Sequence, residues 1–300
     1  MSLCDDFLEY LKSERNKSDN TLKSYDVSLR QFEDFFESLG EGHTWQTVTR
    51  DVVQEWVIYL VDNQHYNNSS VNARLSALRT FYHYLKRVGI ETANPMQLIS
   101  GPKKGKVLPS FVKEKEMDVL LDSEFPDTFE GILEKTVITM LYMTGMRCSE
   151  FLALEDKDVD FYSKQIKVTG KRNKQRLIPF GQELEDCIKQ YMRKRNATVP
   201  EGAQKFLVNS KGKALTYFRL SGIVKANLTK VTTMQKRSPH VLRHSFATTL
   251  LNNHADIVSI QQLLGHADLS TTEVYTHLSF DDLNNAYKQA HPRGDTDSTT

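Results

Sequence analysis

The chain has 300 residues, enough for two domains with separate cores, and its 39% apolar and 26% charged residues are ordinary for a globular protein. No run approaches the roughly 18 apolar residues of a membrane helix, and the amino terminus does not read as a secretion signal. Cys4, Cys148 and Cys187 form neither a metal-ligand spacing nor a disulfide framework. We therefore expect a cytoplasmic protein with no membrane partner, no metal and no other cofactor.

The charge of the chain is unevenly distributed, although its formal net value is only +1. Residues 1–100 carry 10 Lys and Arg against 14 Asp and Glu, whereas residues 101–300 carry 29 against 24. Basic residues gather without an intervening acid in 164–176 and again in 225–243. Such clusters can neutralise phosphates, and solvated surface charge is the alternative interpretation of each cluster.

The first hundred residues predict a small helical bundle. Apolar residues recur there in steps of three and four, the spacing of an amphipathic helix. The expected helices lie near residues 7–11, 22–39, 52–61 and 71–85. Ser69 or Ser70 is expected to cap the last of them, and Gly40 and Gly89 each to end a helix.

Residues 101–109 predict a flexible basic linker. This segment combines glycine and proline with three lysines, among them Lys103 and Lys104. A linker of this kind could cross a DNA backbone, and an ordinary interdomain connector is the alternative. Residues 110–293 would then form the second domain, and the polar tail 294–300 is expected to be disordered.

The second domain is expected to be mainly α-helical with a small antiparallel β-sheet. Two alternating segments, 166–168 and 176–178, predict strands that flank a turn. Helices are expected at residues 129–144, 148–154, 182–195, 216–228, 239–252, 256–264 and 282–290.

Four short segments in this domain carry the chemistry. They are Thr-Gly-Met-Arg at 144–147, Gly-Lys at 170–171, His-Val-Leu-Arg at 240–243, and Leu-Gly-His at 264–266 followed by Tyr275. Together they supply guanidiniums, an ammonium, imidazoles and a phenol. Arginine forks match phosphate oxygens, and an activated tyrosine can form a covalent intermediate. This set indicates a tyrosine that attacks a phosphodiester.

Each of these residues also has a structural interpretation. Tyr275 could be a half-buried core tyrosine, although Ser270 and Glu273 have capping-box spacing that places it in the first turns of a helix. Arg147 could form a salt bridge with Glu150, which could equally orient Arg147 for catalysis.

The second arginine is expected on a helix that Ser238 caps and Pro239 opens. His240 and Arg243 are one turn apart on that helix, so they share a face.

The order and spacing of the four segments resemble the signature of the tyrosine recombinases, or lambda integrase family, and most nearly the Xer type that resolves chromosome dimers. The resemblance runs from about residue 20 to residue 293. It implies a core-binding domain over residues 1–100, which clamps one face of DNA, and a catalytic tyrosine-recombinase domain over residues 110–293.

The resemblance also implies the role of each site residue. Tyr275 would be the nucleophile, Arg147 and Arg243 would hold the phosphate, and Lys171 would protonate the departing 5′-oxygen. His240 and His266 would act on the tyrosine proton and the phosphate oxygens. The residues expected to contact DNA are Arg74, Arg79, Lys103, Lys104, Arg172 and Lys174. Arg172 stands where the family usually has glycine.

The expected function is site-specific recombination of double-stranded DNA through a 3′-phosphotyrosyl intermediate and a Holliday junction, with an Xer-like role in chromosome partition and the cell cycle. The expected assembly is a homo- or hetero-tetramer on DNA, with residues 283–290 docked on a neighbour and a DNA translocase as a candidate activator. The alternatives are an integrase or DNA invertase of a mobile element, a type IB topoisomerase, and a non-catalytic DNA-binding protein.

Overall fold

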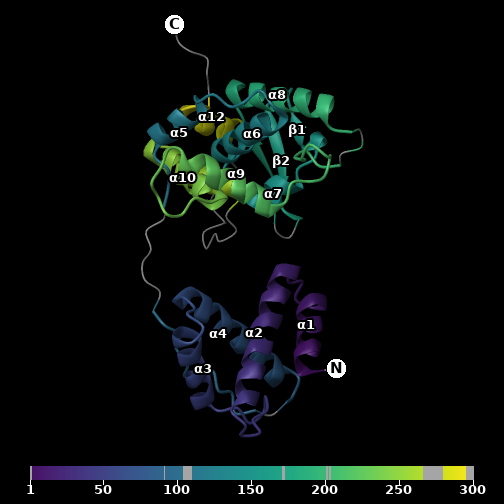
Figure 1. Cartoon of the computed structure of the whole chain (residues 1–300), viewed down its shortest axis with the longest axis vertical. Helices are drawn as coiled ribbons and strands as arrows, with labels where there is room; N and C mark the ends of the chain where they lie inside the picture. Colours follow the sequence, from purple (N-terminus) through teal and green to yellow (C-terminus); the bar gives the residue numbers. More distant parts are fainter. Residues whose placement is uncertain are drawn as a thin grey trace. The chain divides into compact units, whose positions relative to one another are not determined.

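The computed structural model describes residues 2–90, 92–103, 110–170, 173–200, 202, 204–265 and 280–294. The chain divides into two compact units, Met1–Val107 and Leu108–Thr300, whose elements are labelled in Figure 1. In these described ranges no helix is both long and apolar enough to cross a membrane. Most of the expected linker and all but one residue of the expected tail lie outside the described residues.

Unit 1 is the helical bundle that the periodicity predicted. Its helices are α1 (Leu3–Ser13), α2 (Asp19–Ser38), α3 (Arg50–Asp62) and α4 (Asn68–Arg87). An aromatic core that includes Phe32, Trp45, Trp56 and Phe81 holds them together. The expected cap of α4 was wrong, because Asn67 is the N-cap residue and its carboxamide oxygen accepts the main-chain N–H of Ser70.

Unit 2 is built around one buried helix. Its helices are α5 (Glu114–Leu121), α6 (Phe129–Thr144), α7 (Cys148–Ala153), the 3₁₀ turn η1 (Asp156–Asp158), α8 (Gln182–Thr198), α9 (Tyr217–Thr229), α10 (Pro239–Asn252), α11 (Ile257–Leu264) and α12 (Phe280–Ala290). Helix α6 is apolar on nearly all sides and packs against α8, α9 and α10 (Figure 1). The mainly helical fold is therefore confirmed.

A small antiparallel sheet lies beside these helices. Its strands are β1 (Val159–Asp160), β2 (Gln165–Thr169) and β3 (Gln175–Pro179), in the order β1-β2-β3. Ile166 pairs with Ile178, and Thr169 pairs with Gln175 at the end of the hairpin. The β2–β3 hairpin is the one that the sequence predicted, and β1 adds a short third strand.

Helix α12 packs on its own domain, against α10, α11 and β3. Tyr287 and Ala290 are buried in a core cluster with Phe246 and Leu263. The expectation was that residues 283–290 dock on a neighbouring protomer. In the single chain, the apolar side of this helix is already covered from within.

Candidate active site

Arg243 is held inside unit 2 by the ends of two other helices. Only 9% of the residue is exposed. Its Nη1 donates to the carbonyl of Gly145 after α6, and its Nη2 donates to the carbonyl of Leu264 at the end of α11, both at 2.7 Å. Burial, and then the charges of Arg147 and Arg176, lower its pKa to about 10. The guanidinium is still a cation at pH 7.

Arg147 is the N-cap residue of α7 and the more exposed of the two arginines. Its main-chain N–H donates to Glu150 Oε2 at 2.8 Å, and its Nη1 donates to Oε1 at 2.9 Å. Its Nη2 donates to the carbonyl of Gly265 at 2.7 Å. With 37% of its side chain exposed, Arg147 has an open side, as a ligand for a substrate phosphate requires.

Glu150 supplies the negative charge of the cluster. Its side chain is 1% exposed and accepts hydrogen bonds from Arg147 and, in a bidentate pair at 2.8 and 2.9 Å, from Arg176. Burial alone raises the pKa of this carboxyl, but the bonds and charges of the two arginines outweigh burial and lower the pKa to about 2. A permanent anion thus lies between two permanent cations, and the salt bridge between Arg147 and Glu150 is present.

The carboxyl end of α11 is fixed by the same arginines. The last carbonyls of a helix have no partner within the helix and carry its negative pole, so they favour cationic donors. Each of three successive carbonyls accepts a bond of 2.7 Å from a different arginine: Leu263 from Arg176, Leu264 from Arg243, and Gly265 from Arg147. The direction in which the chain leaves α11 is therefore set by the cluster.

His240 lies on α10, one turn before Arg243, and is exposed. The helix begins where the sequence predicted, with Ser238 at the N-cap and Pro239 in the first turn. Among the described residues, however, the Ser238 hydroxyl makes no capping hydrogen bond. His240 is thus exposed at the start of α10, one turn before the buried Arg243.

Three predicted catalytic residues, Lys171, His266 and Tyr275, lie outside the described residues, as do the predicted DNA contacts Arg172 and Lys104. Their roles remain predictions.

The chain just before two of these residues nevertheless approaches the arginine cluster. A β-carbon added to Gly170, at the end of β2, would lie 3.2 Å from Glu150 Oε1. One added to Gly265 would lie 3.0 Å from Arg176 Nη1. The positions that precede the predicted general acid and the second histidine therefore both lie against the buried carboxylate and its arginine partner.

Two of the predicted DNA contacts, Arg74 and Arg79 on α4, have partners within unit 1. The Arg74 guanidinium lies 3.8 Å from the centre of the Tyr66 ring, and its Nε donates to Gln31 at 2.7 Å. Arg79 donates to the carbonyl of Ile99 at 2.8 Å. Both arginines are only partly exposed, so a role in DNA contact would involve the face of each guanidinium that these bonds leave open.

Lys103 and Lys174 are exposed, and their main chains are tied down. The carbonyl of Lys103 accepts from Asn68 at 2.9 Å, and the carbonyl of Lys174 accepts from the Gly170 N–H at 2.8 Å, which closes the β2–β3 hairpin. The two lysines therefore carry their charge at the surface. This position is compatible with contact to phosphates and equally with solvation alone.

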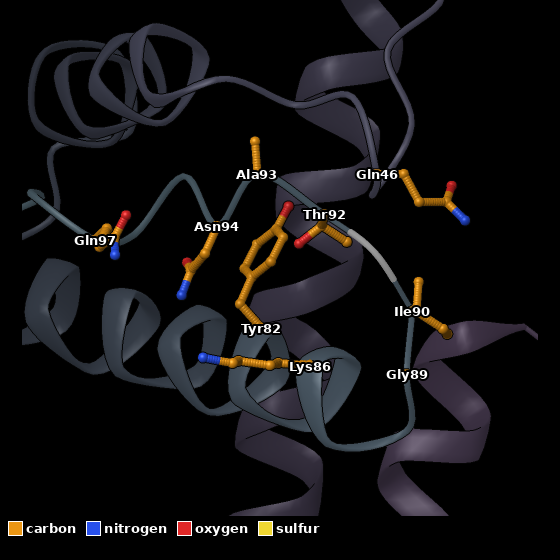
Figure 2. Close-up of a pocket in the computed structure, with 9 residues that line it drawn as sticks. All are labelled: Gln46, Tyr82, Lys86, Gly89, Ile90, Thr92, Ala93, Asn94 and Gln97. Carbon is orange, nitrogen blue, oxygen red and sulfur yellow. The ribbon is translucent and has the colours of Figure 1, made fainter.

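Figure 2 shows a cavity of about 830 Å³ in unit 1, between α4 and the chain that follows it. Its lining is largely polar and consists of Gln46, Tyr82, Lys86, Gly89, Ile90, Thr92, Ala93, Asn94 and Gln97. The Tyr82 hydroxyl is already bonded to the carbonyl of Trp45. This lining holds none of the predicted catalytic residues, so the cavity is separate from the candidate site.

Arg176 is the site residue that sequence reasoning missed. The sequence shows it only as the last of a run of basic residues, with nothing to separate it from its neighbours. The available signal was the alternation that puts it on a strand, together with the expectation that Glu150 is a partner of arginine.

Comparison with known proteins places the chain in a family. Residues 110–282 match the phage integrase family, and residues 4–89 match the N-terminal SAM-like domain of phage integrases. Tyrosine recombinase XerC of Staphylococcus aureus (strain USA300 / TCH1516) is 37% identical over 296 residues, which cover 99% of this chain and 98% of that protein.

Solved structures share the fold at lower identity. XerH site-specific recombinase, in a post-cleavage complex with a palindromic difH substrate, aligns with a TM-score of 0.71 at 23% identity, over 95% of this chain and 84% of that one. The Tn1549 transposon integrase in complex with circular intermediate DNA aligns with a TM-score of 0.68 at 20% identity, over 95% of this chain and 98% of that one.

The chain therefore belongs to the phage integrase family, whose members are tyrosine recombinases. This confirms the predicted enzyme class, a tyrosine-type site-specific recombinase, and the predicted likeness to Xer proteins.

Proposed function

We propose that the protein cuts and rejoins double-stranded DNA at a specific site, one strand pair at a time, through a 3′-phosphotyrosyl intermediate and a Holliday junction. Its proposed role is Xer-like resolution of chromosome dimers in the cytoplasm. The observation that carries the proposal is the pair Arg147 and Arg243, fixed on the carbonyl ends of two helices around buried Glu150. Two cations in a preorganised frame suit a phosphate that gains charge.

The proposed reaction begins with the Tyr275 hydroxyl, which attacks the scissile phosphate. A tyrosine O–P bond forms while the P–O5′ bond breaks, so the phosphate passes to the enzyme and a 5′-hydroxyl leaves. His240 takes the tyrosine proton, and Lys171 gives a proton to the departing oxygen. Attack by the 5′-hydroxyl of the partner strand reverses these steps, and because the phosphodiester energy is retained no ATP is needed.

Arg147 and Arg243 would stabilise the pentacoordinate phosphorane, which carries one more negative charge than the substrate. Charges that are already oriented need no rearrangement when the transition state forms, so they contribute strongly to catalysis. The exposed side of Arg147 would meet the phosphate, while Arg243 supports it from a buried position. His266 would donate to a remaining non-bridging oxygen.

The two units have separate proposed tasks on DNA. Residues 1–100 would clamp one face of the duplex, residues 101–109 would cross the backbone, and residues 110–293 would carry the chemistry. Four protomers would assemble on paired sites, either four copies of this chain or two with two of a related recombinase. A DNA translocase is a proposed activator.

The test uses a nicked duplex that carries a candidate recombination site from the host chromosome. The nick lets the cleaved fragment diffuse away and traps the covalent complex, which a denaturing gel then reveals. We expect an adduct with the wild-type chain and none with Tyr275→Phe. Tyr162→Phe is the matched control, because that tyrosine is 99% exposed in unit 2 and has no proposed role.

An adduct that persists in Tyr275→Phe would refute the nucleophile. Relaxation of a supercoiled plasmid that lacks the site would instead favour a topoisomerase, and adducts formed only on mobile-element ends would favour the integrase alternative.

A further inference from the structure

Arg176 connects three elements that are distant in the sequence. From β3 it reaches Glu150, 26 residues away on α7, with two bonds of 2.8 and 2.9 Å. Its Nε donates to the carbonyl of Leu263, 87 residues away at the end of α11, at 2.7 Å. All three guanidinium nitrogens therefore have protein partners, and only 13% of the side chain is exposed.

This engagement distinguishes Arg176 from the two arginines that would hold phosphate. Arg147 is 37% exposed and leaves one side open, whereas Arg176 has every nitrogen occupied. Its guanidinium also fills the space beside Gly265, where an added β-carbon would meet its Nη1, Cδ and Cζ at 3.0 to 3.3 Å. Arg176 can therefore affect the chemistry only through the groups that it holds.

We propose that Arg176 is a positioning residue for strand cleavage: it fixes the Glu150 carboxylate, which orients Arg147, and fixes the main chain at the end of α11, from which the segment with the predicted His266 continues. This inference rests on the proposed function. Among the residues that the structure describes, removal of Arg176 leaves Arg147 as the ion-pair partner of Glu150 and takes away the side-chain donor of the Leu263 carbonyl. Misplacement of the phosphate ligands by about 1 Å can cost about 100-fold in rate.

The first test measures the single-turnover rate of adduct formation on the nicked duplex with Arg176→Met, which keeps the apolar stem and removes the guanidinium. We expect the rate to fall by about 100-fold while the affinity for uncleaved DNA is unchanged, because every guanidinium nitrogen of Arg176 is already bonded within the protein.

Arg195→Met is the matched control. Arg195 is also a buried arginine, 6% exposed, with a bidentate bond to Asp156 at 2.7 and 2.6 Å and a bond to the carbonyl of Phe206. Arg195 lies on α8, and its partners Asp156 on η1 and Phe206 after α8 do not belong to the Glu150 cluster. The variant Arg195→Met should lower the melting temperature without a comparable loss of cleavage rate. Equal loss in both variants would make the Arg176 effect one of general stability.

The second test reads the pH dependence of the cleavage rate, which a purely structural role would not change. In Arg176→Met the pKa of Glu150 should rise, because burial then meets less opposing charge. The variant should therefore lose rate as the pH is lowered, over a range in which the wild type does not. Adding Glu150→Gln to Arg176→Met should abolish this extra acid dependence, because an amide does not titrate.

The third test needs no DNA. Amide hydrogen exchange of the peptide spanning residues 260–265 should be faster in Arg176→Met than in the wild type and in Arg195→Met. If the wild type forms no adduct on any site, the proposed function fails, and the exchange result still decides whether Arg176 holds the end of α11. Wild-type exchange in Arg176→Met, or a wild-type cleavage rate, would overturn the inference.

Discussion

Gly145 meets two demands at once, a left-handed backbone and a lack of space. It ends α6 at φ +58°, and an added β-carbon would lie 2.4 Å from a ring carbon of Phe246 and 3.0 Å from Leu264. Its carbonyl is also a partner of Arg243. A side chain at this position would displace the end of α6 and with it the carbonyl that holds Arg243.

We predict that Gly145→Ala costs more than the left-handed conformation alone, which is about 1–2 kcal/mol. Overpacking against Phe246 adds about 1–3 kcal/mol to the loss in free energy of unfolding. Gly89→Ala is the control, because Gly89 has φ +79° but open space around its Cα. Urea unfolding of each variant measures the difference, and equal costs would contradict the role of crowding.

At this scale the sequence predicted the residues whose chemistry suits a phosphodiester and missed Arg176, which bonds to Glu150 and to the end of α11. Arg147, His240 and Arg243 belong to short segments whose residue types and order along the chain form a pattern, so motif order could single them out. The partners of Arg176 are far away along the chain. Only the fold brings them together, and a basic residue in a basic run gives no sign of it.

At the scale of elements, a buried imidazole just after α12 packs this end of the helix against the rest of unit 2. The His291 ring stacks on Tyr287 with centroids 5.3 Å apart and lies edge-on to Tyr142 at the same distance. Burial, with a smaller effect from Arg293, lowers the pKa of His291 to about 3. Docking therefore requires the neutral ring.

The expected consequence is weaker docking of α12 in mild acid. Above pH 6.5 the ring is neutral in the docked and undocked states, so it contributes no pH dependence. Between pH 6.5 and about 3 the undocked ring takes up a proton that the docked ring excludes, so docking weakens by up to about 1.4 kcal/mol per pH unit.

Hydrogen exchange of α12 at pH 7 and pH 5 measures this effect. The variant His291→Phe keeps the aromatic contacts and the three ion pairs of Arg293, so it should show a smaller change between the two pH values. The same acid sensitivity in both chains would assign the effect to the carboxylates around Arg293, which are Asp118, Asp122 and Glu183.

Element prediction succeeded for most helices and for the β2–β3 hairpin, and it missed α5 and β1. The long helices follow from apolar stripes of many residues, and the β2–β3 hairpin follows from two short alternating segments that flank a turn. Strand β1 has only two residues, too few for a period to emerge, and was missed. Helix α5 was also missed, although its eight residues equal the length of α11, which was predicted. Asn67 was missed as a cap because two serines nearby have equal propensity for the position.

At the scale of the whole molecule, the positions of the tryptophans make it possible to follow the unfolding of unit 1 apart from that of unit 2. Both tryptophans of the chain, Trp45 and Trp56, lie in the core of unit 1. Indole fluorescence therefore reports unfolding of this unit, while circular dichroism reports both.

We predict that Gly145→Ala, a change in unit 2, shifts the far-ultraviolet unfolding transition and leaves the fluorescence transition where it is. Each unit has its own apolar core, so each should unfold as a cooperative body. A common shift of both signals would show that the units unfold together.

The sequence could not show which surface covers α12. The apolar stripe of this helix predicts that it packs against another apolar surface, which could belong to the same chain or to a neighbouring protomer. Truncation after Leu278 should weaken tetramer assembly and lower recombination if residues 283–290 dock on a neighbour, but it also uncovers Phe246 and Leu263. We therefore expect a lower melting temperature of unit 2 in the free truncated protein, with the assembly effect superimposed.

The packing of α12 on its own domain also bears on how many protomers can join. A protomer that gave its α12 to a neighbour would bare the same surface on itself. In a linear assembly, the surface that normally packs against α12 would stay exposed on one terminal protomer, whatever the length of the assembly. In a closed cycle every surface is filled again, and no chain is worse packed than it was alone. The number of subunits would then be the number that closes the ring. Each α12 would make the same kind of contact in the ring as it makes in the single protomer.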